Sequence, residues 1–313
     1  MNVTYRDAAA ELCPLPVVEH PQAEQIEEGV RSWAGAQTIF HDAKSARAAE
    51  YGRLSAGLYP RSGVAEAVLA GCVLMYLFEL DGELVEVPAG KGDAPAAARQ
   101  LLRWEAVLAP HDVGTVPPRD DSSRTLLGLW QQITAVSGRE HQARLRLAWR
   151  TYALGAAAEA AFMSTSTMPS PAEYAVLRAH TIADWPLVWI EITSGYVLPE
   201  ALWNSPAISR LNQLSQHLLG ISNDIWSWSR EHAASDTAVN YPAVLARHHQ
   251  CSLARGLEMT LGLHRKVMEQ FLATHERLSR ADCSLTRRYA NDVATLVAGW
   301  YHWCERTSRY AQT

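Results

Sequence analysis

The chain has 313 residues, of which 48% are hydrophobic and 19% charged, and its formal net charge is −5. No block of lysine and arginine occurs, so a nucleic-acid surface is not expected. No apolar stretch is long enough to span a bilayer, no secretory signal is visible, and the five scattered cysteines form no CxxC pair. We therefore expect a soluble, cytoplasmic protein without a disulfide framework or a zinc site.

Helical periodicity dominates the chain, and strand-like alternation is nearly absent. In chain order, helices are predicted over residues 22–35, 44–57, 63–81, 94–109, 122–137, 139–163, 171–184, 187–195, 206–232, 240–247, 250–280 and 284–308. Two starts are well signalled, because Ser170-Pro171 is followed by a capping-box acid at Glu173 and Ser205 precedes Pro206. Loops are expected over 82–95 and 232–240. No linker or repeat divides these helices, so one all-α domain over residues 1–313 is predicted.

Three oxygen-bearing side chains stand four residues apart in the predicted helix 206–232, namely Asn223, Ser227 and Glu231. Each four-residue step climbs roughly 6 Å and turns about 40° beyond a full turn, so the three share one stripe. An amide oxygen, a hydroxyl and a carboxylate suit a hard cation such as Mg²⁺. Arg230 stands beside Glu231 as an anion partner, which suggests a phosphate or diphosphate group in the substrate.

A solvated helix face would also place polar residues at this spacing. The rest of the helix argues against it, because the polar arc contains no lysine and one acid over more than five turns, whereas solvated faces normally carry Lys and Glu. We therefore expect this arc to face an enclosed polar interior. Its members are Ser209, Asn212, Gln213, Gln216, Gly220, Asn223, Ser227 and Glu231.

Residues 223–231 match, at every specified position, the second metal motif Asn-Asp-x-x-Ser-x-x-Lys/Arg-Glu of class I terpene synthases, and the chain resembles the bacterial terpene cyclases among them. This resemblance implies a class I terpenoid synthase-like α-helical bundle around a central active-site cavity. It also implies that Asn223, Ser227 and Glu231 bind Mg²⁺ and that Arg230 contacts the substrate diphosphate. Three Mg²⁺ ions are expected, with Mn²⁺ as a substitute.

The resemblance extends to a diphosphate-sensing arginine 45 residues before the Asn of the motif, which here is Arg178. Pro186 lacks an N–H, clashes with the Ile182 carbonyl and disfavours helical geometry at Trp185, so the helix should break here. The Ile182 and Ala183 carbonyls would then lose their usual partners. The family implies a linker at Thr181 and an effector carbonyl at Ile182 or Ala183; the alternative is a simple packing kink.

Further likenesses concern an acid and the end of the sequence. Glu159, on an otherwise apolar helix, would be costly to bury unpaired, and the family implies that it orients Arg178. Arg309-Tyr310 resembles the family's terminal Arg-Tyr pair, which hydrogen-bonds the diphosphate. Aromatic side chains can stabilise cationic carbon, and the expected cavity-lining residues are Phe78, Trp303, Trp185 and Trp189.

The family's first metal motif, Asp-Asp-x-x-Asp/Glu, is reduced in this chain. Asp81 aligns with its first aspartate, Gly82 replaces the second, and Val85 stands where the third acid belongs. Glu86 lies one residue further and is a candidate substitute ligand. An active cyclase, a low-activity relative and a non-catalytic descendant remain open, and we favour the first because the other diphosphate-site elements are intact.

The resemblance therefore implies an Mg²⁺-dependent class I terpene cyclase, a carbon–oxygen lyase that ionises farnesyl diphosphate or, next in preference, geranylgeranyl diphosphate. The product would be a sesquiterpene or diterpene hydrocarbon or alcohol, released with diphosphate. The alternatives are a non-catalytic isoprenoid-binding relative and a chain-elongating prenyltransferase, which should carry two aspartate-rich motifs. The expected partner is the prenyl diphosphate, not nucleic acid or membrane, and a homodimer stays open.

Overall fold

The computed structural model describes residues 12–40, 49–81, 91–108, 118, 120–234 and 239–310. For residues 79–81, 229–230 and 232–234 it describes the backbone course within the helices and not the side chains.

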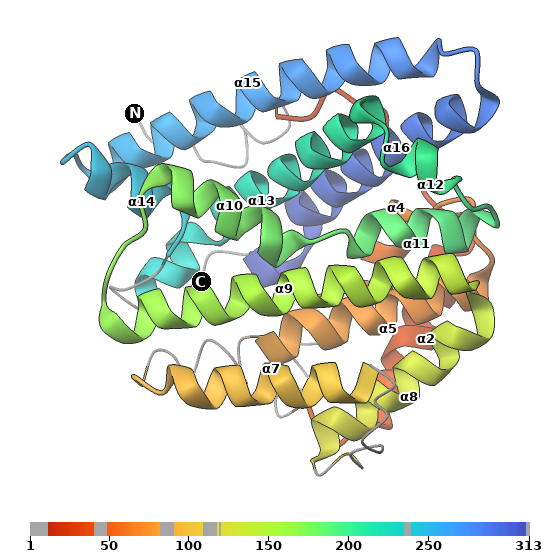
Figure 1. Cartoon of the computed structure of the whole chain (residues 1–313), viewed down its shortest axis with the longest axis horizontal. Coiled ribbons are helices and arrows are strands. Elements are labelled where there is room, and N and C mark those ends of the chain that lie inside the picture. The colour runs from red at the N-terminus through yellow and green to blue at the C-terminus, as the bar shows by residue number, and fades with distance from the viewer. Residues whose placement is uncertain are drawn as a thin grey trace.

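The described chain is built from α-helices connected by short turns, without a β-strand (Figure 1). This confirms the predicted all-α class. The helices are α2 (Ala23–Gly35), α4 (Tyr51–Leu58), α5 (Val64–Asp81), α7 (Ala94–Leu108), α8 (Asp121–Val136), α9 (Arg139–Thr165), α10 (Pro171–Ile182), α11 (Trp185–Ser194), α12 (Glu200–Trp203), α13 (Pro206–Ala234), α14 (Tyr241–His248), α15 (Leu253–Ser279) and α16 (Ser284–Arg306), followed by a 3₁₀ turn at Ser308–Tyr310.

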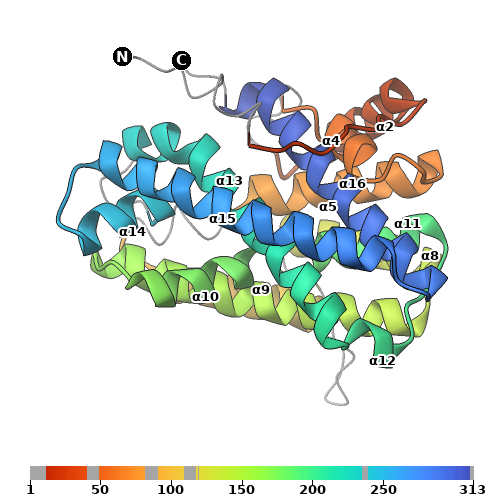
Figure 2. The ribbon, with the colours of Figure 1, turned by 90° about the horizontal axis from the view of Figure 1, so that it is seen from above.

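The long helices form a bundle in which α13 and α16 lie in the interior. Helix α13 contacts α10, α14, α15 and α16, whereas α16 contacts α4, α11, α13 and α15. Helix α9 runs across the molecule between α7 and the α10–α11 pair, and α15 covers the opposite side (Figures 1 and 2). Helix α13 is therefore packed against helices of the C-terminal half of the chain.

The bundle is held by burial of one continuous apolar core, which contains the apolar side of α13. Leu211, Leu214, Leu218, Ile221 and Ile225 are each at most 4% exposed. Burial of each such side chain contributes about 1.5–3 kcal/mol. Since one side of α13 is fixed in this core, its polar arc must turn toward α10 and the end of α16.

The predicted start of α10 is confirmed in detail. Ser170 Oγ accepts a hydrogen bond from the Glu173 main-chain N–H at 3.3 Å, and the Glu173 carboxylate accepts one from the Ser170 N–H at 2.7 Å. Pro171 occupies the first helical position, where its missing N–H is not needed. Likewise α13 begins at Pro206, directly after Ser205.

The predicted break between α10 and α11 is present, but its position differs from the prediction. Trp185 was expected outside the helix, yet it is the first residue of α11, with Pro186 second. The break in the helix falls at Ala183, whose φ of 52° and ψ of −167° are strained for a residue with a Cβ. Burial of Trp185 against the Trp149 ring outweighs the modest steric penalty that a following proline imposes.

Helix lengths and termini differ slightly from the predictions elsewhere. Helix α13 continues to Ala234, so the loop expected from residue 232 begins later, and residues 235–238 are outside the described part. Most of the loop expected over 82–95 is also outside it. All five cysteines are free. Among the described helices, none combines the length and the apolar character needed to cross a membrane.

Candidate active site

Arg178, in the last turns of α10, joins α10 to the polar arc of α13. Its Nε donates to Asp224 Oδ1 at 2.8 Å, its Nη2 to Asn223 Oδ1 at 2.6 Å, and its Nη1 to Thr181 Oγ1 at 2.9 Å. The structure therefore brings together the predicted sensor, the predicted linker and the first predicted metal ligand, which lie up to 45 residues apart in the sequence.

Two glycines permit this close approach. A Cβ on Gly220 of α13 would lie 2.9 Å from Arg178 Cγ, and a Cβ on Gly155 of α9 would lie 2.8 Å from His180 Cβ. Both distances are shorter than carbon atoms tolerate, so a larger residue at either position would push α10 outward. The gap that Gly220 leaves in the polar arc is thus filled by the aliphatic part of Arg178.

The charge of Arg178 is held firmly by its surroundings. The guanidinium side chain is 14% exposed and that of Asp224 is 4% exposed. Burial alone disfavours the cation, but the carboxylate of Asp224, together with the more distant charges of Glu159 and Glu231, raises the pKa of Arg178 above its ordinary value. Arg178 is therefore a permanent buried cation beside Asn223.

Asp224 is a direct ionic partner of Arg178 that the sequence interpretation did not identify. Its Oδ2 accepts from Tyr174 Oη at 2.8 Å and from the Tyr241 main-chain N–H at 2.9 Å. Burial raises the pKa of Asp224 to about 6, although Arg178 acts in the opposite direction. Asp224 stands in the metal motif directly after Asn223, so the sequence marks it as a site residue. Its hydrogen-bond partners come from distant parts of the chain and are visible only in the structure.

The three predicted metal ligands share one side of α13. Asn223 Nδ2 donates to Tyr310 Oη at 2.8 Å, and the hydroxyl of Ser227 donates to the Asn223 main-chain carbonyl at 2.8 Å. Glu231 Oε2 accepts from Asn240 Nδ2 at 2.9 Å. Ser227 is fully buried, while Asn223 and Glu231 are half-buried. The stripe is therefore lined by protein along its length.

Asn240 is a site residue that the sequence interpretation missed. It is 3% exposed, and besides its bond to Glu231 its Oδ1 accepts from the Ala243 N–H at 3.0 Å, which caps α14. The sequence could have revealed the helix cap, because Asn240 precedes Tyr241-Pro242. It could not have revealed the contact with Glu231, because that contact depends on how α14 is placed beside α13. One amide thus fixes both a helix end and a predicted ligand.

The predicted terminal pair Arg309-Tyr310 lies against the same region. Arg309 Nη1 donates to Tyr51 Oη at 2.8 Å, and its guanidinium lies 5.1 Å from the centre of the Phe78 ring. The Phe78 contact places the C-terminal turn of α5, which ends at Asp81, beside the end of α16. Two predicted diphosphate contacts and the helix of the reduced first motif therefore converge.

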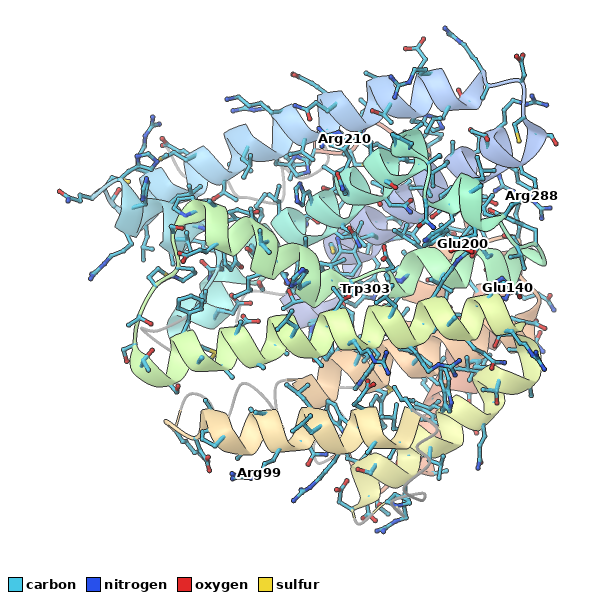
Figure 3. The ribbon with its side chains drawn as sticks, in the orientation of Figure 1. Arg99, Glu140, Glu200, Arg210, Arg288 and Trp303 are labelled. Atoms are coloured by element: carbon cyan, nitrogen blue, oxygen red, sulfur yellow. The ribbon has the colours of Figure 1, made fainter. Side chains whose placement is uncertain are left out.

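Aromatic rings fill the space between α4, α5 and α16. Phe78 stacks on Trp300 at 6.1 Å and contacts Trp303 at the same distance, and Trp303 lies 5.7 Å from Tyr310. Trp303 is 4% exposed and lies near the centre of the molecule in the view of Figure 3. Of the two predicted cavity residues here, only Phe78 is half-buried; Trp303 is mainly core.

Two predicted cavity residues, Trp185 and Trp189, lie away from this contact network. Trp185 and Trp189 are buried on α11, with Trp185 packed on Trp149 at 6.2 Å. Glu159 acts on Arg178 through its charge. Glu86 lies outside the described residues, as do the side chains of Asp81 and Arg230. The polar arc also differs at Gln213, which is exposed to solvent, whereas its neighbour Asn212 is buried.

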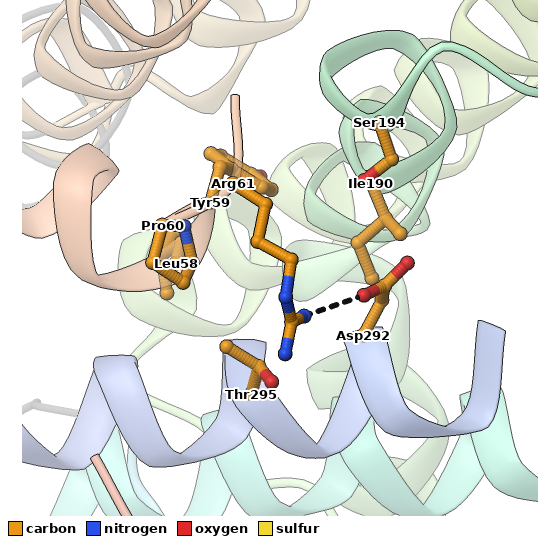
Figure 4. A pocket seen from close by; sticks show the side chains of 8 residues that line it. All are labelled: Leu58, Tyr59, Pro60, Arg61, Ile190, Ser194, Asp292 and Thr295. Carbon is orange, nitrogen blue, oxygen red and sulfur yellow. Dashed lines mark hydrogen bonds and ion pairs between the residues drawn. The ribbon is translucent and has the colours of Figure 1, made fainter. Parts of the chain in front are cut away.

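A hollow at the N-terminal half of α16 is separate from this network. It is lined by residues that include Arg61, Ile190, Asp292 and Thr295, and Arg61 Nη1 donates to Asp292 Oδ1 at 2.9 Å (Figure 4). None of the predicted site residues lines it. The hollow thus holds an ion pair that fixes the end of α4 to α16.

The donor set on α13 fits a hard divalent cation. It consists of an amide oxygen, a hydroxyl oxygen and a carboxylate, which are ligands that Mg²⁺ accepts, and no softer sulfur or imidazole ligand competes in the stripe. Within the described residues, Ser227 donates its hydrogen and accepts none, and Glu231 accepts from Asn240 through Oε2 alone. Asn223 Oδ1 would bind a cation in place of the hydrogen bond that it accepts from Arg178.

The sequence matches the model of terpene synthase family 2, C-terminal metal binding, over residues 73–270. The chain is 26% identical to tsukubadiene synthase of Streptomyces tsukubensis, with 96% of this chain and 89% of the relative covered. It is 25% identical to the farnesyl-diphosphate-cyclizing 4-epi-cubebol synthase of Streptosporangium roseum, with 95% and 90% covered. The chain therefore belongs to the terpene synthase family and is a class I enzyme of that kind.

Solved structures agree with this assignment at the level of the fold. 2-Methylisoborneol synthase from Streptomyces coelicolor A3(2), solved with Mg²⁺ and 2-fluoroneryl diphosphate, superposes with a TM-score of 0.86 at 20% identity, covering 96% of this chain and 98% of that one. A cucumene synthase variant gives a TM-score of 0.83 at 22% identity, with 96% and 99% covered. The class I all-α fold predicted from the sequence is confirmed.

Proposed function

We propose that the protein is an Mg²⁺-dependent cyclase of a linear prenyl diphosphate, with farnesyl diphosphate favoured and geranylgeranyl diphosphate next. The observation that carries the proposal is the hydrogen-bonded series Arg178–Asn223–Tyr310, which joins α10, α13 and the residues after α16. A buried cation, a metal-type oxygen donor and a phenol at one place suit a diphosphate with its metal ions.

The bond that must break joins an allylic carbon to the diphosphate oxygen. Mg²⁺ bound at Asn223, Ser227 and Glu231 would supply Lewis-acid stabilisation of the departing negative charge. Arg178 adds a positive charge at the same place, and its cationic form is guaranteed by Asp224. These groups act on charge that develops only as the C–O bond breaks, so they lower the barrier to ionisation.

The contact between Arg178 and Asn223 suggests how this ionisation is coupled to binding. Asn223 Oδ1 accepts Arg178 Nη2 at 2.6 Å, so the same oxygen serves either the guanidinium or a metal ion. If Asn223 Oδ1 held a metal ion, Arg178 Nη2 would be available to donate to the diphosphate. Arg178 also bonds Thr181, three residues away and one before Ile182, so its movement is transmitted toward the break.

The break between α10 and α11 leaves carbonyl dipoles available to an allylic cation formed at this site. Within the described residues, the carbonyl oxygens of Ile182 and Ala183 accept no hydrogen bond. Pro186 has no N–H to donate to the Ile182 carbonyl. The N–H groups of Leu187 and Val188 donate to the Asp184 carbonyl and not to that of Ala183. Two free carbonyls adjacent to the sensor turn support an effector role toward an allylic cation.

Incubation of the protein with Mg²⁺ and geranyl, farnesyl and geranylgeranyl diphosphate tests the proposal. We expect diphosphate release with at least one of these substrates and cyclic hydrocarbons or alcohols detected by gas chromatography. Longer prenyl diphosphates would identify a chain-elongating prenyltransferase instead. No diphosphate release with any substrate, from protein that binds them, would identify a non-catalytic isoprenoid-binding protein.

A further inference from the structure

Asp184, the residue at the break between α10 and α11, has a carboxylate without a cationic partner. Gln216 Nε2 donates to its Oδ1 at 2.9 Å, and this is the one side-chain hydrogen bond that the carboxylate makes within the described residues. No arginine, lysine or histidine pairs with it there. Burial raises the pKa of this carboxyl group above its ordinary value. A half-buried acid with only a neutral partner is costly to keep, so its presence needs a reason.

The ordinary local reason for an aspartate at this position is absent. Asp184 is the N-cap of α11, and an N-cap aspartate usually accepts a hydrogen bond from the second or third N–H of its helix. Here the side chain makes no such bond, although its main-chain carbonyl accepts from Leu187 and Val188 at 3.0 Å each. The carboxylate turns away from its own helix and toward α13.

Its partner lies on the polar arc of α13 that also carries the predicted metal ligands. Gln216 precedes Asn223 by seven residues, which is two helical turns and about 10 Å along the axis. Between them, Gly220 lies under Arg178 and Ile182. The arc therefore has a diphosphate end at Asn223 and a second polar position about 10 Å deeper, at Gln216 and Asp184.

That depth corresponds to the hydrocarbon part of a bound prenyl diphosphate. A carbon chain advances roughly 1.3 Å per bond, because a single C–C bond is about 1.5 Å long. A substrate anchored by its diphosphate at Asn223 and Arg178 thus has carbon atoms near the middle of its chain beside Asp184. After ring closure, positive charge moves from the ionised carbon to carbons of this kind.

We propose that Asp184 is a catalytic carboxylate that stabilises the cyclised carbocation and accepts the proton that ends the reaction. This rests on the cyclase function proposed above. In the final step, a C–H bond next to the cationic carbon breaks and its electron pair becomes the new double bond. The proton binds Asp184 Oδ2, and the neutral acid returns the proton to water after the product leaves. Gln216 occupies Oδ1 through its hydrogen bond, which leaves Oδ2 to take the proton.

The expected effect of removing this charge is on the product and not on ionisation. Asp184→Asn keeps the size of the side chain and an oxygen for Gln216 but removes the negative charge. Diphosphate release should stay within about threefold of wild type, because metal and Arg178 govern it. The ratio of the main product to its double-bond isomers and alcohols should change by at least about tenfold.

Asp184→Glu is the matched control, because it keeps the charge and shifts the carboxylate by one methylene. Its product ratio should lie closer to wild type than that of Asp184→Asn. An unchanged product ratio in folded Asp184→Asn would overturn the proposal, as would the same change in both variants. If Asp184→Asn does not fold, Gln216→Met frees the carboxylate without removing it; a changed product ratio supports the proposal and an unchanged one overturns it.

The wild-type reaction separates this inference from the function on which it rests. If the wild-type protein releases no diphosphate from any prenyl diphosphate in the presence of Mg²⁺, the cyclase function fails. If it forms cyclic products and the variants form the same products in the same ratio, only the role of Asp184 fails.

Discussion

The two segments that resemble metal motifs, 223–231 on α13 and 81–86 from the end of α5, differ in what supports their oxygen donors. The donors of the first, Asn223, Ser227 and Glu231, all lie within one continuous helix. Of the second set, Asp81 is the last residue of α5, and its side chain and the whole of Glu86 lie outside the described residues. Helix geometry therefore fixes the spacing of the first set, whereas no oxygen donor of the second set is among the described side chains.

The difference extends to the residues that surround each set. Around α13, Arg178, Tyr310 and Asn240 each make a hydrogen bond to a predicted ligand. Around the end of α5, the described contacts belong to Phe78, which packs against rings and against Arg309. A ligand set with its own supporting hydrogen bonds is expected to carry most of the affinity for metal.

The largest effect should follow from Asn223→Ala, which removes a predicted ligand and the partner of both Arg178 and Tyr310. We expect diphosphate release to fall at least about 100-fold, a loss typical of removing one group that stabilises departing charge. The exposed residue Gln213 on the same helix offers a control, since Gln213→Ala should leave activity unchanged. Retained activity in Asn223→Ala would remove the metal assignment from α13.

Asp224→Asn should mainly destabilise the fold around Arg178. Three donors point at this carboxylate, from Arg178, Tyr174 and Tyr241, and an amide satisfies them only in part. An uncompensated buried cation costs about 3–5 kcal/mol, which denaturant unfolding would measure. Asp292→Asn is a matched control, because its partner Arg61 is 59% exposed and solvent replaces the lost pair; we expect a cost of about 1 kcal/mol. Equal costs would mean that burial of Arg178 does not matter.

Asn240→Ala tests the support of Glu231 without touching a predicted ligand. Loss of a hydrogen bond to a metal ligand typically lowers metal affinity about 10- to 100-fold, so the Mg²⁺ concentration for half-maximal diphosphate release should rise by that factor. The variant also loses an N-cap, at a cost of about 1 kcal/mol. Ser252→Ala removes the cap of α15 alone and should lower stability without changing the Mg²⁺ dependence. A shift in both variants would assign the effect to stability.

Features that depend on spacing within one helix can be predicted from the sequence, whereas contacts between distant residues cannot. The start of α10 and the stripe on α13 depend on spacing within one helix, and both were predicted from Ser170-Pro171 and from the four-residue repeat. The partners of Asp224 lie 17, 46 and 50 residues away, so periodicity gave no sign of them. The helix break falls two residues earlier than the proline rule predicts, because Trp185 is buried as the first residue of α11.

The smallest effect is expected from Glu86→Gln, which asks whether the reduced motif retains a second ligand. If Glu86 binds metal with Asp81, removing its charge should raise the Mg²⁺ requirement by about threefold to tenfold, since affinity at oxygen sites follows ligand charge. This should be less than the shift in Asn240→Ala, because the α13 set supplies most of the affinity. Glu83→Gln, three residues earlier, is the control for charge alone. An unchanged Mg²⁺ dependence would exclude Glu86 as a ligand and leave Asp81 as the one acid of that motif. A shift larger than that of Asn240→Ala would reverse the order of the two regions and make the end of α5 the stronger metal site.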